Sequence, residues 1–378
     1  METHIGKKSL IIFSLRIREI SLLHIPTQGG RRENFMYIGK SKSGYEITWD
    51  ISRRHNFNNF ALLTGKSGCG KTTLCKMLAK GASEDGLAVL IMDYSGSYYE
   101  KEITDLYPRL NYINIERDGL GLKPFQPCLR RIEESLREES REDIVCRITD
   151  VICTGYRLRG ARQRCLVRQA AFSVLYTYGK DAALRDIYYA TKDDALKSRL
   201  FGLTRNKEAK ERLDWNQLLQ PGTVTVLQLS DADIYNRLIC TELLLADLWN
   251  RTEQRALREY MICLDEIQNL SFKPDSTLAH MLREARKYSV SMLLSTQFIS
   301  GSNSDMRELL EQAALRFCFK PLDSEVRATA KTIDSVNDHI WAAELQNLKI
   351  GQYVFKGSGV VGDEPRDMKA VLSYELRK

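Results

Sequence analysis

The stretch FALLTGKSGCGKTT, residues 60–73, decides the fold of this chain. Its first five residues are apolar enough for a short buried strand, a glycine-rich turn comes next, and the segment after the turn favours a helix. A strand, a glycine turn and a helix in this order, with the spacing G-x-x-x-x-G-K-T, are the context of a phosphate-binding loop, or P-loop. The stretch therefore predicts a polyphosphate site.

Each part of this loop has an expected role. The glycines let backbone N–H groups point inward at an anion, and the following helix adds the positive end of its dipole. Lys71 is expected at the β- and γ-phosphates, and Thr72 is expected to place its hydroxyl on Mg²⁺. The residues expected to bind the nucleotide are Gly65, Lys66, Ser67, Gly68, Cys69, Gly70, Lys71, Thr72 and Thr73.

Composition indicates a globular protein. The chain has 378 residues, 43% of them hydrophobic and 28% charged, enough for one large α/β domain with an insertion or for two domains. Its net charge of +7 suggests an acidic partner such as nucleic acid, although a mildly basic surface without a partner is also common. The nine scattered cysteines contain no C-x-x-C pair, so we expect reduced thiols and a cytoplasmic protein.

The N-terminus has one ambiguous feature. Lys7 and Lys8 precede the apolar run SLIIFSL, which resembles a signal peptide. Arg16, Arg18 and Glu19 interrupt the run, so we predict a strand at 9–17 instead. No segment approaches the apolar length that spans a bilayer, and we expect no membrane insertion.

The order of patterns predicts four parts. Residues 1–59 are expected to be β-rich, with strands at 33–39 and 45–51 joined by a hairpin turn, KSKSG. Residues 60–128 would be the first part of the core, with a buried strand at 87–96 and another at 109–116. Helical spacing over 129–219 predicts an α-helical insertion. The core would resume over 220–378, with a helix at 237–259 and strands at 222–231, 260–266, 289–297, 315–320 and 351–357.

Two carboxylates end the strand MICL. Nucleotide hydrolysis needs one carboxylate to hold Mg²⁺ and a second to orient and deprotonate water. Asp265 suits the first role and Glu266 the second. Gln297 ends the next predicted strand, where it could bind the γ-phosphate or the attacking water, or simply face solvent.

Together these segments resemble the HerA/FtsK superfamily of ring-forming DNA-translocating ATPases, close to the HerA-like proteins and the conjugation ATPases. The segments are GKSGCGKTT, VLIMDYSGSY, GLKPFQP, PGTVTVLQLSD, MICLDEIQNL and LREARKYSVSMLLSTQ, and the resemblance covers residues 35–357. It implies an α/β, RecA-like (ASCE) P-loop NTPase fold with a mostly parallel sheet, an α-helical insertion and a short β-rich N-terminal part. It also implies a hydrolytic site made of Lys71, Thr72, Asp265, Glu266 and Gln297.

The resemblance further implies a homohexamer with ATP between subunits, where a neighbour supplies an arginine. Arg286 is the first candidate and Arg283 the second, although either could lie on a solvated helix face or pair with Glu284. Ser97 departs from the family pattern, which often has an acidic residue there. Residues 1–59 are too few for the β-barrel that precedes the core in archetypal members.

The segment GYRLRGARQRCLVR offers a second DNA contact. Arg157, Arg159, Arg162, Arg164 and Arg168 could touch phosphates, and Tyr156 could stack on a base. Alternatively, the arginines pair with a helix over RIEESLREESRED, residues 131–143.

These observations predict an ATP-hydrolysing ring motor that translocates on double-stranded DNA. A nuclease or other effector partner is expected, in DNA end processing or defence against foreign DNA, because no nuclease site is visible in the chain. The alternatives are a conjugation or secretion ATPase, and a nucleotide-gated ring scaffold that activates an effector.

Overall fold

The computed structural model describes residues 35–50, 60–132, 135–207, 209, 212–274, 276–299, 304–362 and 364–374. Residues from Asn34 onward form one compact unit. The strand predicted at 9–17 lies outside the described residues.

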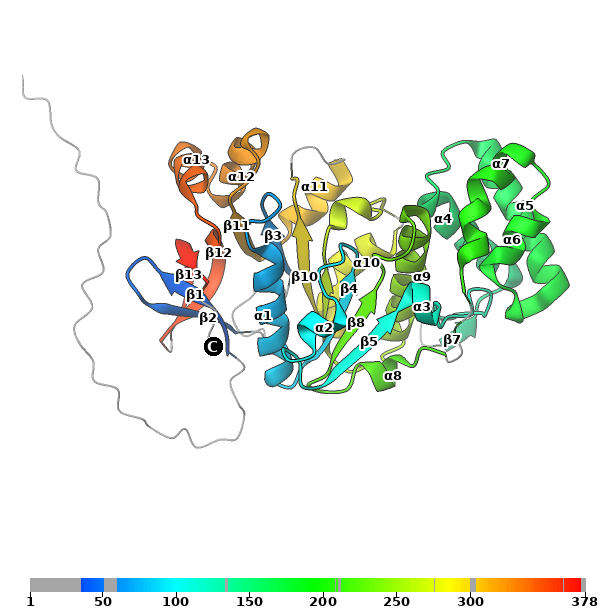
Figure 1. The fold of residues 1–378 in the computed structure, drawn as a ribbon, viewed down its shortest axis with the longest axis horizontal. Coiled ribbons are helices and arrows are strands. Elements are labelled where there is room, and N and C mark those ends of the chain that lie inside the picture. Colours follow the sequence, from blue (N-terminus) through cyan, green and yellow to red (C-terminus); the bar gives the residue numbers. More distant parts are fainter. Residues whose placement is uncertain are drawn as a thin grey trace, which may run out of the picture. The chain divides into compact units, whose positions relative to one another are not determined.

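An eleven-stranded sheet forms the centre of this unit (Figure 1). Its strands in spatial order are β13 (Glu364–Ser373), β1 (Phe35–Ser41), β2 (Glu46–Asp50), β12 (Gln352–Val361), β11 (Leu315–Phe319), β3 (Phe60–Thr64), β10 (Val290–Thr296), β9 (Tyr260–Leu264), β4 (Ala88–Asp93), β8 (Val224–Gln228) and β5 (Leu110–Asn114).

The strands from β11 to β5 are all parallel, whereas β12, β13, β1 and β2 pair antiparallel. The predicted mostly parallel α/β fold is confirmed. The hairpin predicted at residues 33–51 is also confirmed, as β1 and β2, but it belongs to the main sheet and pairs with the C-terminal strands β12 and β13.

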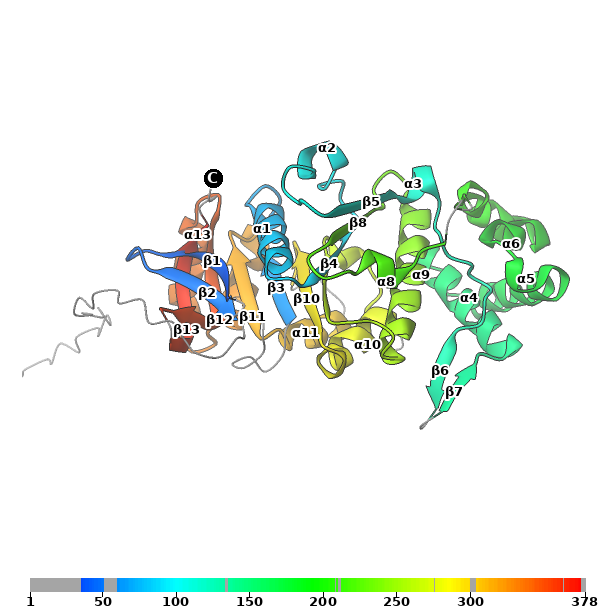
Figure 2. The same cartoon turned by 90° about the horizontal axis from the view of Figure 1, so that it is seen from below.

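Helices cover both faces of the sheet, with α1 on one side and α10 and α11 on the other (Figure 2). The helices and 3-10 turns are α1 (Lys71–Glu84), α2 (Glu100–Ile103), α3 (Ile115–Asp118), α4 (Arg141–Gly155), α5 (Ala161–Tyr178), η1 (Gly179–Asp181), α6 (Leu184–Ala190), α7 (Asp194–Arg199), η2 (Leu200–Arg205), α8 (Trp215–Leu218), α9 (Ile234–Glu253), η3 (Ile267–Asn269), α10 (Thr277–Glu284), η4 (Ala285–Tyr288), α11 (Ser304–Glu311), η5 (Asp323–Glu325), α12 (Val326–Ile333) and α13 (Asp338–Asn347).

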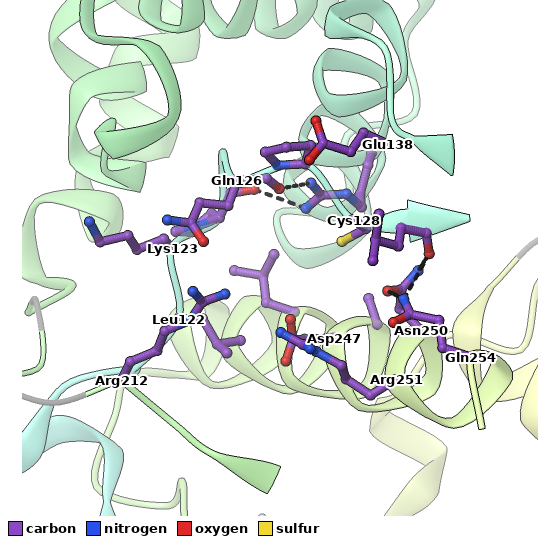
Figure 3. Close-up of a pocket in the computed structure, with 16 residues that line it drawn as sticks. Leu122, Lys123, Gln126, Cys128, Glu138, Arg212, Asp247, Asn250, Arg251 and Gln254 are labelled. Atoms are coloured by element: carbon purple, nitrogen blue, oxygen red, sulfur yellow. Dashed lines mark hydrogen bonds between the residues drawn. The ribbon is translucent and has the colours of Figure 1, made fainter. Parts of the chain in front are cut away.

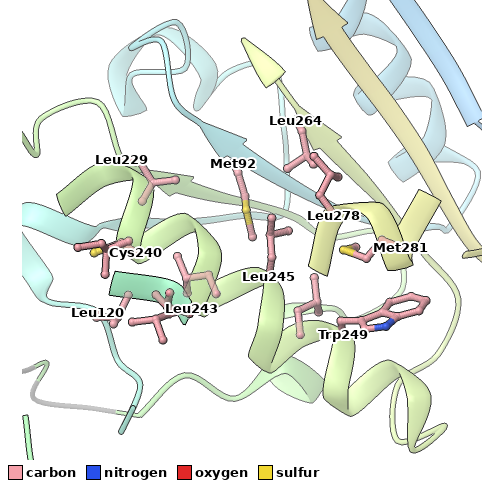
Figure 4. Close-up of a cluster of buried hydrophobic side chains, with 14 of the residues drawn as sticks. Met92, Leu120, Leu229, Cys240, Leu243, Leu245, Trp249, Leu264, Leu278 and Met281 are labelled. Carbon is pink, nitrogen blue, oxygen red and sulfur yellow. The ribbon is translucent and has the colours of Figure 1, made fainter. Parts of the chain in front are cut away.

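The two covered faces explain why the parallel strands are apolar without interruption. In β9, Ile262 and Leu264 join the core under α9 and α10, and Met261 and Cys263 join the core under α1. Successive strand residues point to opposite faces, so both sets must be apolar. Figure 4 shows the first core, where Leu245 and Trp249 of α9 lie near Leu278 and Met281 of α10.

The long helix after β8 starts earlier than predicted. Asp233 caps α9 by accepting from the N–H groups of Tyr235 and Asn236, and the helix ends at Glu253 rather than Glu259. An aspartate at this position satisfies N–H groups that have no partner within the helix.

The prediction of a helix over residues 131–143 is wrong for the first part of that range. The chain forms a two-stranded hairpin there, β6 (Leu129–Ile132) and β7 (Ser135–Glu138), and α4 begins only at Arg141. Ser140 and Asp143 make a capping box that fixes this start. The buried carboxylate of Glu139 accepts from Arg147 and from the N–H of Cys128, which closes the base of the hairpin. The helices α4 to α8 occupy most of 129–219, and the four-part division stays a proposal.

Candidate nucleotide site

The P-loop runs between β3 and α1 and is held by the neighbouring strands. The N–H of Lys66 donates to the Lys320 carbonyl just after β11, at 2.9 Å, and the N–H of Gly351 donates to the Cys69 carbonyl at 3.0 Å. Gly65 has φ +146, and a Cβ there would lie 2.7 Å from Cβ of Phe319. A larger residue would therefore be strained and would collide with β11.

Lys71 lies inside the loop that it is predicted to serve. Its ammonium donates to the carbonyl of Gly65 at 2.8 Å and to that of Lys66 at 3.1 Å, and the residue is only 6% exposed. Cys69 is also buried, which raises the pKa of its thiol. Lys66, Ser67, Gly68 and Thr73 are exposed, and Gly70 and Thr72 are half-buried. A buried cation in a glycine turn at a helix start fits a polyphosphate, whose oxygens can replace the two carbonyls as partners of the ammonium.

Asp265 follows β9 and reaches the P-loop across the intervening strand β10. Its Oδ2 is 3.5 Å from Thr72 Oγ1 and 3.3 Å from Ser95 Oγ, and its Oδ1 accepts from the N–H of Glu266 at 3.0 Å. The structure thus brings together the hydroxyl and the carboxylate predicted to hold Mg²⁺. Two oxygen donors of this kind fit Mg²⁺, which proteins commonly hold through one or two side chains while water and phosphate oxygens supply the other ligands.

Glu266 is fixed by its backbone and by two glutamines. It has φ +52 and ψ +43, a left-handed conformation uncommon for a residue with a side chain. Nε2 of Gln297 donates to both carboxylate oxygens, at 2.9 and 3.0 Å, and Nε2 of Gln268 donates to Oε2. Thr296 donates to Gln268 at 2.9 Å and so holds the second glutamine in place. The predicted site residue Gln297 is therefore hydrogen-bonded to Glu266. It follows β10, the strand that pairs with β9.

Sequence reasoning did not single out Asp93, Ser95 or Gln268. Asp93 is fully buried at the end of β4 and accepts from four successive N–H groups, those of Ser95, Gly96, Ser97 and Tyr98, at 2.9 to 3.2 Å. Burial raises its pKa, which these bonds partly offset. Ser97, the departure from the family pattern, donates its N–H to Asp93, and its hydroxyl accepts from Ser95 at 2.8 Å. The signal available in the sequence was the order Asp-x-Ser-Gly, which favours a turn closed by the aspartate.

Arg283 and Arg286 do not join this group within the chain. They lie on α10 and η4, in the connection between the end of β9 and the start of β10, and both are exposed. Arg283 donates to the Pro274 carbonyl at 2.9 Å. Glu284 pairs with Lys287 at 3.2 Å and with neither arginine in any described contact. Their role toward a neighbouring subunit stays a prediction.

The predicted stacking role of Tyr156 is wrong. Tyr156 is 2% exposed and stacks on Tyr235 with 5.2 Å between ring centroids. The five arginines after it are all exposed, and two of them have acidic partners: Arg164 pairs with Asp150, and Arg162 with Asp193 at 3.6 Å. The predicted partner helix over 131–143 is replaced by the hairpin and the start of α4, and no described ion pair joins the arginines to it.

A cavity of about 250 Å³ lies elsewhere, between residues 122–129 and α9 (Figure 3). Arg147 reaches its wall and donates to the carbonyls of Pro124 and Gln126, both at 2.9 Å. Asp247 accepts from the Trp215 indole at 2.6 Å. Because no P-loop residue and neither Asp265 nor Glu266 lines it, this cavity is separate from the nucleotide site.

Within the described part of the chain, no helix combines the length and the apolar character needed to cross a bilayer.

Comparisons with known proteins show the family to which the chain belongs. The family model "Helicase HerA, central domain" matches residues 37–248, more than half of the chain. A "DNA double-strand break repair helicase HerA" from Sulfurisphaera tokodaii is 24% identical over 351 residues, which cover 85% of this chain and 67% of that protein. The chain spans about two thirds or less of the length of the curated relatives it matches.

Two solved structures share the fold. VirB4 of Thermoanaerobacter pseudethanolicus superposes with a TM-score of 0.69 at 17% identity, covering 90% of this chain and 96% of VirB4. The bacterial conjugative coupling protein TrwB superposes with a TM-score of 0.53 at 15% identity, covering 85% of this chain and 86% of TrwB. Because the family model matches more than half of the chain, including the P-loop and α1, the chain belongs to the family defined by the central domain of helicase HerA.

Proposed function

We propose that this chain hydrolyses ATP and uses the energy to translocate on double-stranded DNA as a ring, in which the neighbouring subunit completes each site. One observation carries the proposal. Hydrogen-bond contacts join Thr72 to Asp265, Asp265 to the N–H of Glu266, and Glu266 to Gln297, at three strand ends of one sheet edge. Lys71, next to Thr72 in the chain, lies inside the P-loop at the same edge.

Each side chain has a role that follows from its place. The ammonium of Lys71 exchanges the carbonyls of Gly65 and Lys66 for β- and γ-phosphate oxygens. Thr72 and Asp265 would hold Mg²⁺, which supplies positive charge that stabilises the phosphate oxygens when it is bound. Glu266 accepts a proton from the attacking water as the water oxygen bonds to the γ-phosphorus and the bond to the β-phosphate oxygen breaks.

Gln297 and the arginines would link hydrolysis to the rest of the assembly. Each carboxylate oxygen of Glu266 keeps a lone pair beside the one bonded to Gln297, so the amide would orient the carboxylate and lower its basicity without blocking it. Arg286, or Arg283, would act on the site of the next subunit, which suits their exposure and their distance along the chain from the P-loop residues. We propose a homohexamer with a nuclease or another effector as partner, in DNA end processing or defence, because we find no nuclease site among the described residues.

The test is the ATPase rate of the purified chain with and without duplex DNA, for the native protein, Glu266→Gln and Lys71→Ala. We expect duplex DNA to raise the native rate and either variant to lose at least about 100-fold. Equal rates with and without duplex, together with a fully active Glu266→Gln variant, would refute the motor.

The hydrogen bonds that the side-chain amides of Gln297 and Gln268 donate to Glu266 favour a second candidate, a nucleotide-gated ring scaffold with slow turnover. Donors on both oxygens stabilise the carboxylate and make it a weaker base, which suits a protein that binds ATP for longer than it hydrolyses it. Lys71→Ala would then abolish assembly and effector activation, while Glu266→Gln would preserve both. A motor loses its function with either change.

A further inference from the structure

The positive charge of the chain is concentrated in one segment. Residues 157–207 contain twelve Lys and Arg and four Asp, a net charge of +8, whereas the whole chain carries +7. The rest of the chain is therefore almost balanced. This segment includes the elements from α5 to η2. A net charge of this size on so few helices favours a polyanionic partner.

Helix α5 adds exposed aromatic rings to this charge. Arg168, Phe172 and Tyr176 are four residues apart and so lie along one face, over about 12 Å of helix. Phe172 is 51% exposed and Tyr176 is 78% exposed. The opposite face, with Val167 and Val174, is buried in the core, so the outward direction of the aromatic face is fixed by packing.

Aromatic rings also gather on the neighbouring α6 and η2, and α6 lies beside α5 (Figure 1). Tyr189 is 65% exposed and Phe201 is 54% exposed, and both make edge contacts with Tyr188, with ring centroids 5.3 and 6.0 Å apart. The ammonium of Lys197 lies 5.2 Å from the Tyr188 ring centroid. A cation of α7 thus lies against a ring of α6, beside the exposed rings of Tyr189 and Phe201.

We propose that the exposed face of α5, the α5 surface, made of Arg162, Arg168, Phe172 and Tyr176, binds single-stranded nucleic acid. The arginines would contact phosphates, and the two rings would stack on unpaired bases. A duplex offers phosphates but keeps its bases stacked inside, so it leaves the rings without a partner. An acidic protein could use the same residue types, but the net charge of +8 in this segment favours a chain of phosphates.

This inference goes beyond the proposed motor. It concerns residues that make no described contact with the P-loop, and it holds whether or not ATP hydrolysis moves the chain along a duplex.

The experiment measures fluorescence anisotropy of a labelled single-stranded oligonucleotide, and of the same sequence as a duplex, with the full chain at several salt concentrations. The double variant Phe172→Ala/Tyr176→Ala keeps all charges. We expect it to weaken single-strand binding at least about tenfold, to change duplex binding little, and to leave the salt dependence of single-strand binding unchanged. Arg162→Ala/Arg168→Ala should weaken binding and reduce the slope of log affinity against log salt by about 1.4, from roughly 0.7 per phosphate contact.

Matched controls are available in Tyr99→Ala, which removes another exposed ring, and Arg258→Ala, which removes an exposed arginine outside this segment. Both should bind like the native chain, and all variants should keep the native DNA-independent ATPase rate and thermal midpoint. The proposal is overturned if the native chain does not bind the single strand, if the aromatic variant binds it unchanged, or if that variant loses single strand and duplex equally. Unchanged oligonucleotide binding would instead leave a protein as the partner of this surface.

Discussion

Gln297 donates through one nitrogen to both carboxylate oxygens of Glu266, at 2.9 and 3.0 Å. The residue proposed to take a proton from water is therefore already a double acceptor, and Gln268 supplies a further donor to Oε2. Such bonds stabilise the carboxylate in one orientation and hold it away from other partners. In this conformation the two glutamines therefore restrain the orientation of the Glu266 carboxylate.

The first prediction concerns Gln268. Gln268→Leu removes one donor from Glu266 and breaks the link to Thr296, while Gln297 stays in place. We expect the DNA-independent ATPase rate to rise about threefold or more, in line with the loss of one hydrogen bond of about 1 kcal/mol that restrains the base. Gln220→Leu, on a surface turn, is the control and should leave the rate unchanged. A slower Gln268→Leu enzyme would mean that this glutamine positions Glu266 for catalysis instead.

The turn after β4 should depend on Asp93. Asp93→Ala leaves four N–H groups without their acceptor, three of them partly shielded from water. We expect the free energy of unfolding in urea to fall by about 2–4 kcal/mol. Asp93→Asn keeps one acceptor oxygen and should lose less. Equal stability of the alanine variant and the native chain would show that water replaces the carboxylate.

Buried Glu242 should make stability depend on pH. Burial in α9 raises the pKa of its carboxyl from 4.5 to about 7, and the one described partner is the N–H of Ser271 at 3.4 Å. Because the folded state holds the proton more tightly than the unfolded state, the contribution of this group is most favourable below pH 4.5 and is lost as pH rises to about 7. The loss amounts to at most about 3 kcal/mol.

The measurement compares Glu242→Gln with the native chain by urea unfolding between about pH 5 and pH 8, a range that spans the raised pKa. The stability of the variant relative to native should increase over this range, whatever its value at the acidic end. Exposed Glu308→Gln should show a constant difference. A constant difference for Glu242→Gln as well would contradict the raised pKa.

Gly155 tests the contact between α4 and α9. A Cβ at this position would overlap Cγ1 of Ile239. Alanine favours a helix over glycine by about 1 kcal/mol, but overpacking a core costs about 1–3 kcal/mol. We therefore expect Gly155→Ala to destabilise the native chain, and to stabilise an Ile239→Ala background, where the overlapping atom is missing. Thermal unfolding of the four proteins of this cycle checks the change of sign, and the same sign in both backgrounds would contradict the overlap.

Much of the fold could be predicted because the parallel strands carry their own signal. β9 and β10 are buried at every position, which requires a sheet covered on both faces, and the P-loop spacing fixes the turn and the helix after β3. The partners of β1 and β2 could not be predicted, since they pair with strands some 300 residues later. The hairpin at 129–138 was missed because its residues alternate no better than a charged helix, and the contact of Glu139 with Arg147 closes it.

The candidate site was predictable only in part, because contacts between residues distant in the chain leave no local pattern. Lys71, Thr72, Asp265 and Glu266 are marked by local patterns, and the structure places them together; their catalytic roles stay predictions. Gln268 carries no such pattern and Ser95 is marked only as part of a turn, because their importance comes from strands that are adjacent in the sheet but distant in the chain. Tyr156 was misjudged because its environment depends on Tyr235, in a different helix.

The two bonds that brace the P-loop, to the Lys320 carbonyl and from the Gly351 N–H, have a consequence for synthesis. The ribosome translates the P-loop early and translates Lys320 and Gly351 about 250 to 280 residues later, and nascent chains grow at roughly 5–20 residues per second. The loop therefore waits on the order of tens of seconds for the residues that fix its shape. A chain released before Gly351 would lack the N–H that bonds the Cys69 carbonyl, so we expect its P-loop to be less firmly held than in the full chain.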